Sequence, residues 1–174
     1  MERSIVTCKE MLFERGYEVY NEIPISEDET MYKIMAKKSG YNDILVFFLD
    51  KIKFNIKCIG NIFVELHKLD FKHAIIVYKK SITSQTNKTI EQNQNFEFEL
   101  FNEDDLQINI TKHFLQPKFS LLNETETTKF KAKFGVKIPI MRLNDPIARF
   151  YNYKKGNIVQ ITRKNGYVSY RIVC

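Results

Sequence analysis

Charge is divided unevenly along the 174 residues of this chain, and the division marks two parts that we expect to fold separately. Residues 1–110 carry 14 Lys and Arg against 18 Asp and Glu, a net charge of −4. Residues 111–174 carry 13 against 3, a net charge of +10, so the overall +6 hides the asymmetry. A basic segment of this length beside an acidic one is typical of a protein with an anionic partner, either nucleic acid or an acidic protein surface.

Strand and helix patterns alternate through residues 1–110, which predicts an α/β domain. Ser26 and Glu29 form a capping-box pattern, from which we expect a helix through Met31 and Met35. The polar residues 81–95 are expected to form a loop. Two further helices are expected over residues 4–15 and 55–69, and strands over residues 17–23, 43–49, 74–78, 96–100 and 106–110.

Residues 111–174 predict a small β-rich domain with short helices. Asn123 and Glu126 form a capping box that opens one helix. The Asp145-Pro146 pair, an N-cap followed by proline at the first helical position, opens another. The Asn-Gly dipeptide at 165–166 predicts a tight hairpin between the last two strands.

The sequence lacks the short motifs of the common catalytic sites, so we expect no catalytic residue, no metal and no cofactor. There is no glycine-rich phosphate loop, no His-Glu-x-x-His pattern and no nucleophile elbow. One alternative remains, a metal-dependent nuclease, in which Asp43 and Asp70 would hold a divalent ion and Lys72 would support the attacking water. Such a pattern arises readily by chance in a lysine-rich chain.

The charged start of the chain and its short apolar runs predict no signal peptide and no membrane partner. The odd set of Cys8, Cys58 and Cys174 cannot form a fully paired disulfide framework. We therefore expect an intracellular protein with reduced thiols.

Three C-terminal segments, residues 144–151, 154–163 and 167–173, together resemble the C-terminal motif of the subunit 5 family of eukaryotic multisubunit RNA polymerases. The family has a shorter archaeal counterpart, which corresponds to the C-terminal domain alone. The tripeptide Ile138-Pro139-Ile140 stands where the family has an extended proline-containing segment. Asn152 replaces a family glycine, and we expect it to keep the left-handed turn because Asn tolerates that conformation.

Weaker likeness at residues 7–17 and 101–118 extends the resemblance over essentially the whole chain. The family's domain boundary falls near Ile110, where the net charge changes sign. The resemblance therefore implies a jaw domain over residues 1–110 and an assembly domain over residues 111–174. A shortened, drifted copy of this kind is typical of a large DNA virus or a reduced eukaryote.

The resemblance implies an α/β jaw domain, similar in fold to restriction endonucleases but inactive, and a small β-rich assembly domain with short helices. It implies a non-catalytic subunit, present in one copy and not as a homo-oligomer, that docks on the largest polymerase subunit and meets other polymerase subunits. The jaw domain is expected near downstream duplex DNA. The location would be the nucleus for a cellular enzyme, or the cytoplasm or virion for a viral one. The alternative from another class is a free-standing basic DNA-binding module.

Site residues follow from the resemblance. A DNA-proximal loop would include Thr83, Ser84 and Lys88, although Ser84 replaces a family proline. Residues with a structural role in the motif would be Asp145, Pro146 and Gly156. Contacts with the largest polymerase subunit are expected from Arg149, Lys155, Arg163, Tyr170 and Arg171.

Overall fold

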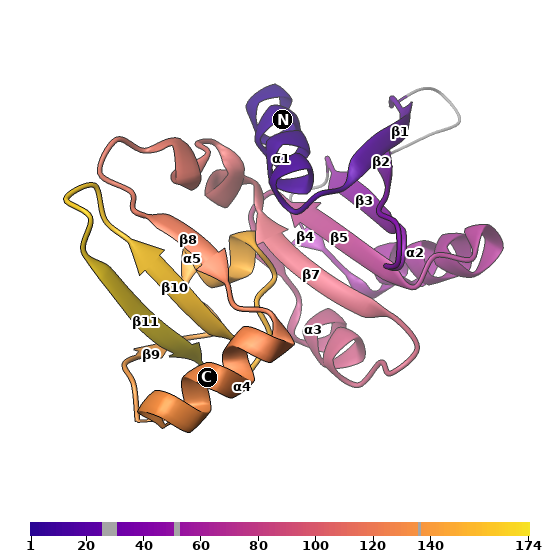
Figure 1. The fold of residues 1–174 in the computed structure, drawn as a ribbon. Coiled ribbons are helices and arrows are strands. Elements are labelled where there is room, and N and C mark those ends of the chain that lie inside the picture. The colour runs from indigo at the N-terminus through magenta and orange to yellow at the C-terminus, as the bar shows by residue number, and fades with distance from the viewer. Residues whose placement is uncertain (26–30, 51–52, 136) are drawn as a thin grey trace. The chain divides into compact units, whose positions relative to one another are not determined.

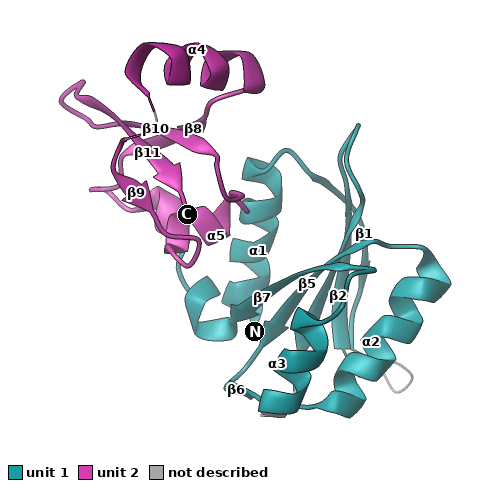
Figure 2. Cartoon of the chain, turned by 90° about the horizontal axis from the view of Figure 1, so that it is seen from below, with its two compact units in different colours: residues 1–108 teal, residues 109–174 magenta. Residues whose placement is uncertain are grey.

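The computed structural model describes residues 1–25, 31–50, 53–135 and 137–174 (Figure 1). They divide into two compact units, unit 1 (Met1–Ile108) and unit 2 (Asn109–Cys174) (Figure 2). The boundary expected from the sequence lies after Ile110. Among the described residues, no helix is long and apolar enough to cross a membrane.

Unit 1 is built on a five-stranded sheet whose strands are β1 (Glu18–Ile23), β2 (Met31–Lys37), β3 (Ile44–Leu49), β5 (His73–Tyr78) and β7 (Glu97–Asn102). The spatial order is β1-β2-β3-β5-β7. The first three strands in this order pair antiparallel, and β3, β5 and β7 pair parallel. Every residue of β3 is buried, because this central strand is covered on both faces.

Helices cover both faces of this sheet, with α1 (Glu2–Glu14) on one side and α2 (Ile56–Leu69) and α3 (Ser84–Glu91) on the other (Figure 2). A two-stranded parallel pair, β4 (Lys53–Phe54) and β6 (Ser81–Ile82), precedes α2 and α3 respectively. The predicted helix over residues 55–69 is confirmed. Its core side chains Ile59, Ile62 and Leu66 pack with Phe47 and Ile76 of the sheet.

The helix expected through Met31 and Met35 is wrong, because these residues form β2. The capping-box pattern at Ser26 and Glu29 lies outside the described residues. β2 lies between β1 and β3 and pairs along its length with the fully buried β3. Hydrogen bonding to a buried neighbour overrides a weak local preference for helix.

Residues 81–95 are not the expected loop, because they contain β6 and α3. Buried Thr86 and Ile90, four residues apart, anchor α3 to unit 1. The strand expected over residues 106–110 is also wrong. Leu106 ends the 3-10 turn η1 (Glu103–Leu106), Ile110 begins the 3-10 turn η2 (Ile110–Lys112), and residues 107–109 connect the two. Asn side chains cap the starts of both turns.

Unit 2 contains a four-stranded sheet made of β8 (Lys118–Leu121), β9 (Ile140–Met141), β10 (Ile158–Thr162) and β11 (Val168–Val173). The order is β8-β10-β11-β9. The hairpin predicted from the Asn-Gly dipeptide is confirmed, since β10 and β11 pair antiparallel around it. With one mixed sheet in each unit and short helices, the chain is of mixed α and β class.

Two helices complete unit 2, α4 (Glu124–Phe134) and α5 (Pro146–Phe150). Both bonds of the predicted capping box of α4 are present: Asn123 Oδ1 accepts from the Glu126 N–H at 2.9 Å, and Glu126 accepts from the Asn123 N–H at 2.8 Å. Asn152 has φ +53°, so the left-handed turn expected of it is confirmed.

The two helices lie on opposite faces of the sheet. Val159 and Ile161 of β10 point to the face covered by α5, where they pack with Ile147. Gln160 and Tyr170 alternate with them and point to the other face. On that face the Tyr170 ring lies 4.6 Å from the Phe130 ring of α4, measured between centroids.

Candidate protein-binding site

A groove of about 460 Å³ opens in unit 2 on the sheet face that α5 covers. Its lining joins segments that are far apart in the sequence. Most lining side chains are apolar, and the two guanidinium groups come from the hairpin. The lining residues are Ile110, Gln116, Pro117, Phe119, Met141, Asp145, Pro146, Ile147, Ile161, Arg163 and Arg171.

Arg163 and Arg171, both expected to meet a partner, are brought together at this groove. Arg163 follows β10, and its backbone N–H donates to the Tyr167 carbonyl at 2.9 Å, which fixes its place in the hairpin. Arg171 pairs in register with the buried Val159. Both side chains are exposed. Within the described part of the chain, the Arg163 guanidinium has no ion-pair partner, and the Arg171 guanidinium donates only to the Ile140 carbonyl, at 3.5 Å.

Asp145 and Pro146 line the groove and also form the start of α5. An Asp145 carboxylate oxygen accepts from the Ile147 N–H at 2.9 Å, and Pro146 begins α5. This bond satisfies one of the free N–H groups at the helix start. The groove thus has two guanidinium groups against one carboxylate that is already engaged, and its charge is net positive.

Exposed apolar side chains lie next to the groove residues in the sequence. Phe114 is 75% exposed and Leu115 is 74% exposed, and they directly precede Gln116 of the groove. The Lys164 ammonium lies 3.5 Å from the centroid of the Phe114 ring. A cation so close to an aromatic face stabilises the position of the ring.

The other residues expected to meet the partner lie elsewhere in unit 2. Tyr170 is on the opposite face of the sheet from Arg171, and its hydroxyl lies 3.3 Å from Gln160 Oε1. Arg149 is half-buried in the last turn of α5, and Lys155 is exposed in the turn that follows. Gly156, expected to be structural, has φ +88° in that same turn, a conformation that suits glycine.

The residues expected near DNA lie at the start of α3 rather than in a loop. Thr83 is the N-cap, and its hydroxyl accepts from the Thr86 N–H and lies 2.8 Å from the Thr86 hydroxyl. Its polar group is therefore used inside unit 1. Ser84 and Lys88 are exposed and, four residues apart, lie on the same side of the helix.

The three residues of the nuclease pattern lie just before the starts of β3 and β5, which are parallel neighbours in the sheet. Asp43 precedes β3 and is exposed, and Asp70 ends α2 in a left-handed conformation with φ +55°. Lys72 Nζ is 3.2 Å from Asp70 Oδ1. In the regions that the structure describes, no three His, Cys, Asp or Glu side chains are grouped as metal ligands.

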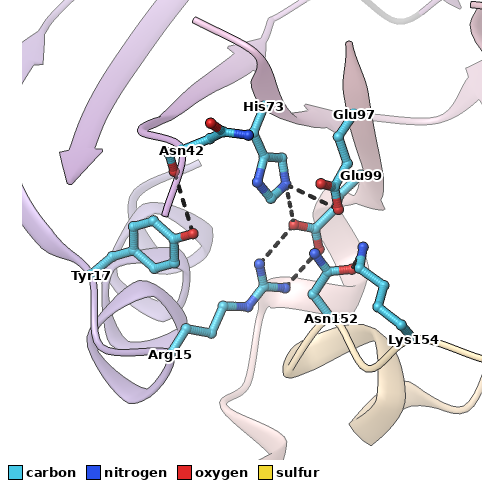
Figure 3. A network of polar contacts seen from close by, with 8 residues as sticks. All are labelled: Arg15, Tyr17, Asn42, His73, Glu97, Glu99, Asn152 and Lys154. Carbon is cyan, nitrogen blue, oxygen red and sulfur yellow. Dashed lines mark hydrogen bonds and ion pairs between the residues drawn. The ribbon is translucent and has the colours of Figure 1, made fainter. Parts of the chain in front are cut away.

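Arg15, Glu99 and His73 form a buried charged cluster (Figure 3). No pattern in the sequence predicted this cluster. Arg15 donates to both oxygens of Glu99, at 2.8 and 2.7 Å. His73 Nε2 lies 2.8 Å from the same carboxylate. The three side chains are only 5–9% exposed. Since each Glu99 oxygen is already bonded and solvent is excluded, we assign the cluster a structural role.

Opposing effects set the pKa of Glu99, and burial is the largest single one. Burial alone would raise it, but the Arg15 guanidinium and the hydrogen bonds from His73 and Arg15 hold the pKa of this carboxyl at about 2. The sequence predicts a strand over residues 96–100, but nothing in its pattern identifies which of the two carboxylates, Glu97 or Glu99, is buried. The partners are 84 and 26 residues away in sequence, so only the fold brings them together.

Acid is expected to destabilise unit 1 through Glu99. Its pKa is about 2 in the folded state against an ordinary 4.5, so the unfolded chain takes up the proton first as the pH falls. The contribution of Glu99 is therefore fully present above about pH 4.5 and is lost between about pH 4.5 and 2. Urea unfolding of the wild type and of Glu99→Gln from pH 7 to 3 measures it. A pH dependence equally steep in both proteins would contradict the assignment.

The family match and the sequence relatives indicate one family. The family described as RNA polymerase Rpb5, C-terminal domain, matches residues 108–173. The chain is 34% identical to a DNA-directed RNA polymerase subunit of Invertebrate iridescent virus 6, over 98% of both chains. It is 32% identical to subunit rpabc1 of RNA polymerases I, II and III of Dictyostelium discoideum, over 84% of this chain and 79% of the relative.

Among solved structures, the chain is similar to EndoMS in its apo form, with a TM-score of 0.39 and 14% identity. The likeness covers 56% of this chain and 45% of the other. A likeness of this extent carries no argument about function.

Proposed function

This chain belongs to the subunit 5 family of DNA-directed RNA polymerases, and from that membership we propose that unit 2 docks it on the largest polymerase subunit while unit 1 lies near downstream duplex DNA. The proposal includes contact with other polymerase subunits and one copy of the chain per complex, with no homo-oligomer. The observation that carries it is the groove of unit 2, which combines unpaired positive charge with apolar lining in the region that the family matches.

Unit 2 has the physical properties expected of a docking module. Its net charge of +10 over residues 111–174 favours an acidic partner surface. A unit of 66 residues buries a limited core and gains stability when a partner binds the folded form. Arg149, Lys155, Arg163 and Arg171 supply cations for the contact, and the packing of Tyr170 against α4 supports the sheet that presents two of them.

Placement of unit 1 near DNA is supported by the exposed face of α3. Ser84 and Lys88 lie on one side of this helix and are free of the internal role that occupies Thr83. A hydroxyl and an ammonium are typical phosphate contacts, and they do not depend on base sequence. Weak, sequence-independent contacts suit a subunit that adjoins DNA as it moves past.

A non-catalytic role is the third part of the proposal. Both carboxylates of the nuclease pattern are exposed, and Asp70 is paired with Lys72. The relatives above bear the names of polymerase subunits. A nuclease would lose its activity with Asp43→Ala and with a chelator, so DNA cleavage that depends on Asp43 and on a metal ion would overturn this part.

Purification through a tag on this chain, from its native source at moderate salt, tests the docking proposal. Mass spectrometry is expected to identify two very large subunits in stoichiometric amounts. We expect the tagged chain in the nucleus if the polymerase is cellular, and in the cytoplasm or virion if the polymerase is viral. Recovery of DNA alone would instead favour the free-standing DNA-binding module.

The affinity of the isolated chain for duplex DNA distinguishes a free-standing DNA-binding module from a polymerase subunit. A free-standing module binds duplex DNA with an affinity that falls steeply with salt, because phosphate contacts release counterions. A polymerase subunit is expected to bind duplex DNA weakly on its own. A salt titration of fluorescence anisotropy, with the full chain and a labelled duplex, makes the measurement.

A further inference from the structure

We propose that the groove of unit 2 is a recognition site for an extended acidic segment of the largest polymerase subunit. In this site Arg163 and Arg171 hold a carboxylate of the segment, and the apolar lining takes a neighbouring apolar side chain. The inference rests on the docking proposed above and specifies its chemistry.

The two arginines carry the first half of the argument. A guanidinium has fixed donors in a planar fork that match the two oxygens of a carboxylate. Arg163 has no ion-pair partner among the described residues, and Arg171 makes only one long bond to a carbonyl. The one carboxylate in the lining, Asp145, is bonded to the Ile147 N–H. Two guanidinium groups are therefore available to an incoming acid.

The apolar lining of the groove is the second reason to expect a polypeptide segment there. Four apolar lining residues offer accessible surface: Pro146 is exposed, and Ile110, Pro117 and Phe119 are half-buried. The other three, Met141, Ile147 and Ile161, belong to the buried core of unit 2. Covering such surface with an apolar side chain removes it from water, which favours binding. Exposed Leu115 and Phe114 adjoin the groove in sequence and extend the apolar area that a partner can cover.

These features favour a polypeptide over nucleic acid. A phosphate backbone has no apolar group to place against Ile, Met and Phe side chains. Lys164 already occupies a face of the Phe114 ring, which is the kind of face on which bases stack. An acidic residue beside an apolar one satisfies both parts of the lining.

A photo-reactive phenylalanine analogue in place of Phe119, in the tagged full chain, identifies the occupant within the native complex. Mass spectrometry is expected to find the cross-link on a segment of the largest subunit with Asp or Glu next to an apolar residue. A cross-link to nucleic acid, or to a segment with no acidic residue, would overturn the inference.

Charge reversal tests the role of the two arginines. The double variant Arg163→Glu with Arg171→Glu is expected to lower recovery of the largest subunit by about tenfold or more, since charge-assisted bonds are replaced by repulsion. The matched control Lys129→Glu reverses an exposed charge on α4, across the sheet from the groove, and is expected to change recovery less than twofold. The conservative Arg163→Lys with Arg171→Lys keeps the charge but loses the fork, and an intermediate loss is expected.

The outcomes separate this inference from the proposed function. If the wild-type chain recovers no large subunit, the docking proposal itself fails. If the wild type and the double Glu variant recover it equally, docking stands and the groove is not its recognition site. Thermal unfolding of the purified full-chain variants shows whether each is folded. If the double variant Arg163→Glu with Arg171→Glu does not fold, the double variant Arg163→Lys with Arg171→Lys still tests the role of the two arginines.

Discussion

Replacing Glu99 by Gln is expected to lower the free energy of unfolding of unit 1 by about 3–5 kcal/mol at neutral pH, the usual cost of removing one partner of a buried ion pair. The buried Arg15 guanidinium would lose the negative charge that it contacts through two bonds to Glu99 oxygens, and the amide that replaces the carboxylate has only one oxygen to accept. His73 would lose a charged acceptor at the same time. Guanidinium chloride unfolding, with hydrogen exchange of β5 and β7, measures the loss within unit 1.

A matched control is available at an exposed ion pair of the same unit. Asp70→Asn also converts a carboxylate to an amide, and Asn accepts the left-handed conformation of this residue. The Asp70 side chain is 88% exposed, so its pairing with Lys72 contributes little and the change is expected to stay within about 0.5 kcal/mol. Equal effects of the two substitutions would show that burial of the Arg15–Glu99 pair is not decisive.

The second large effect is expected from Phe47→Ala, which should destabilise unit 1 by about 3–5 kcal/mol. Phe47 is fully buried in the middle of β3, between β2 and β5, and packs with the core of α2. Truncation leaves a cavity that a sheet hydrogen-bonded on both sides cannot easily close. Denaturant unfolding measures the difference.

Its control is Val64→Ala, on the exposed side of α2. Val64 is 70% exposed, so the substitution removes little packing and is expected to change the free energy of unfolding by less than about 0.5 kcal/mol. A loss at Phe47 no larger than the loss at Val64 would contradict the position of β3 at the centre of unit 1.

Local signals were sufficient wherever a few adjacent residues determine the conformation. The capping box at Asn123, the Asp145-Pro146 helix start and the hairpin at Gly166 all appear in the structure as predicted. In each case the decisive interaction joins residues close together in the chain, so a short stretch of sequence contains both partners.

Long-range interactions explain the failures. β2 was predicted as a helix because the hydrogen bonds that make it a strand come from β1 and β3. α3 was predicted as a loop because its apolar anchors are few and its remaining face is polar. The same limit applies to the candidate site. The resemblance led us to expect partner contacts from Arg163, Arg171 and Tyr170 alike, but only the sheet places the two arginines at one groove and Tyr170 on the opposite face.

Isolation of the polymerase through its own largest subunit tests the central claim most directly, because it does not depend on a tag on this chain. Quantitative mass spectrometry of the active complex is predicted to find this chain at one copy per largest subunit, retained through a moderate salt wash. Its absence from an active complex, or its recovery only in fractions that lack the large subunits, would contradict the account.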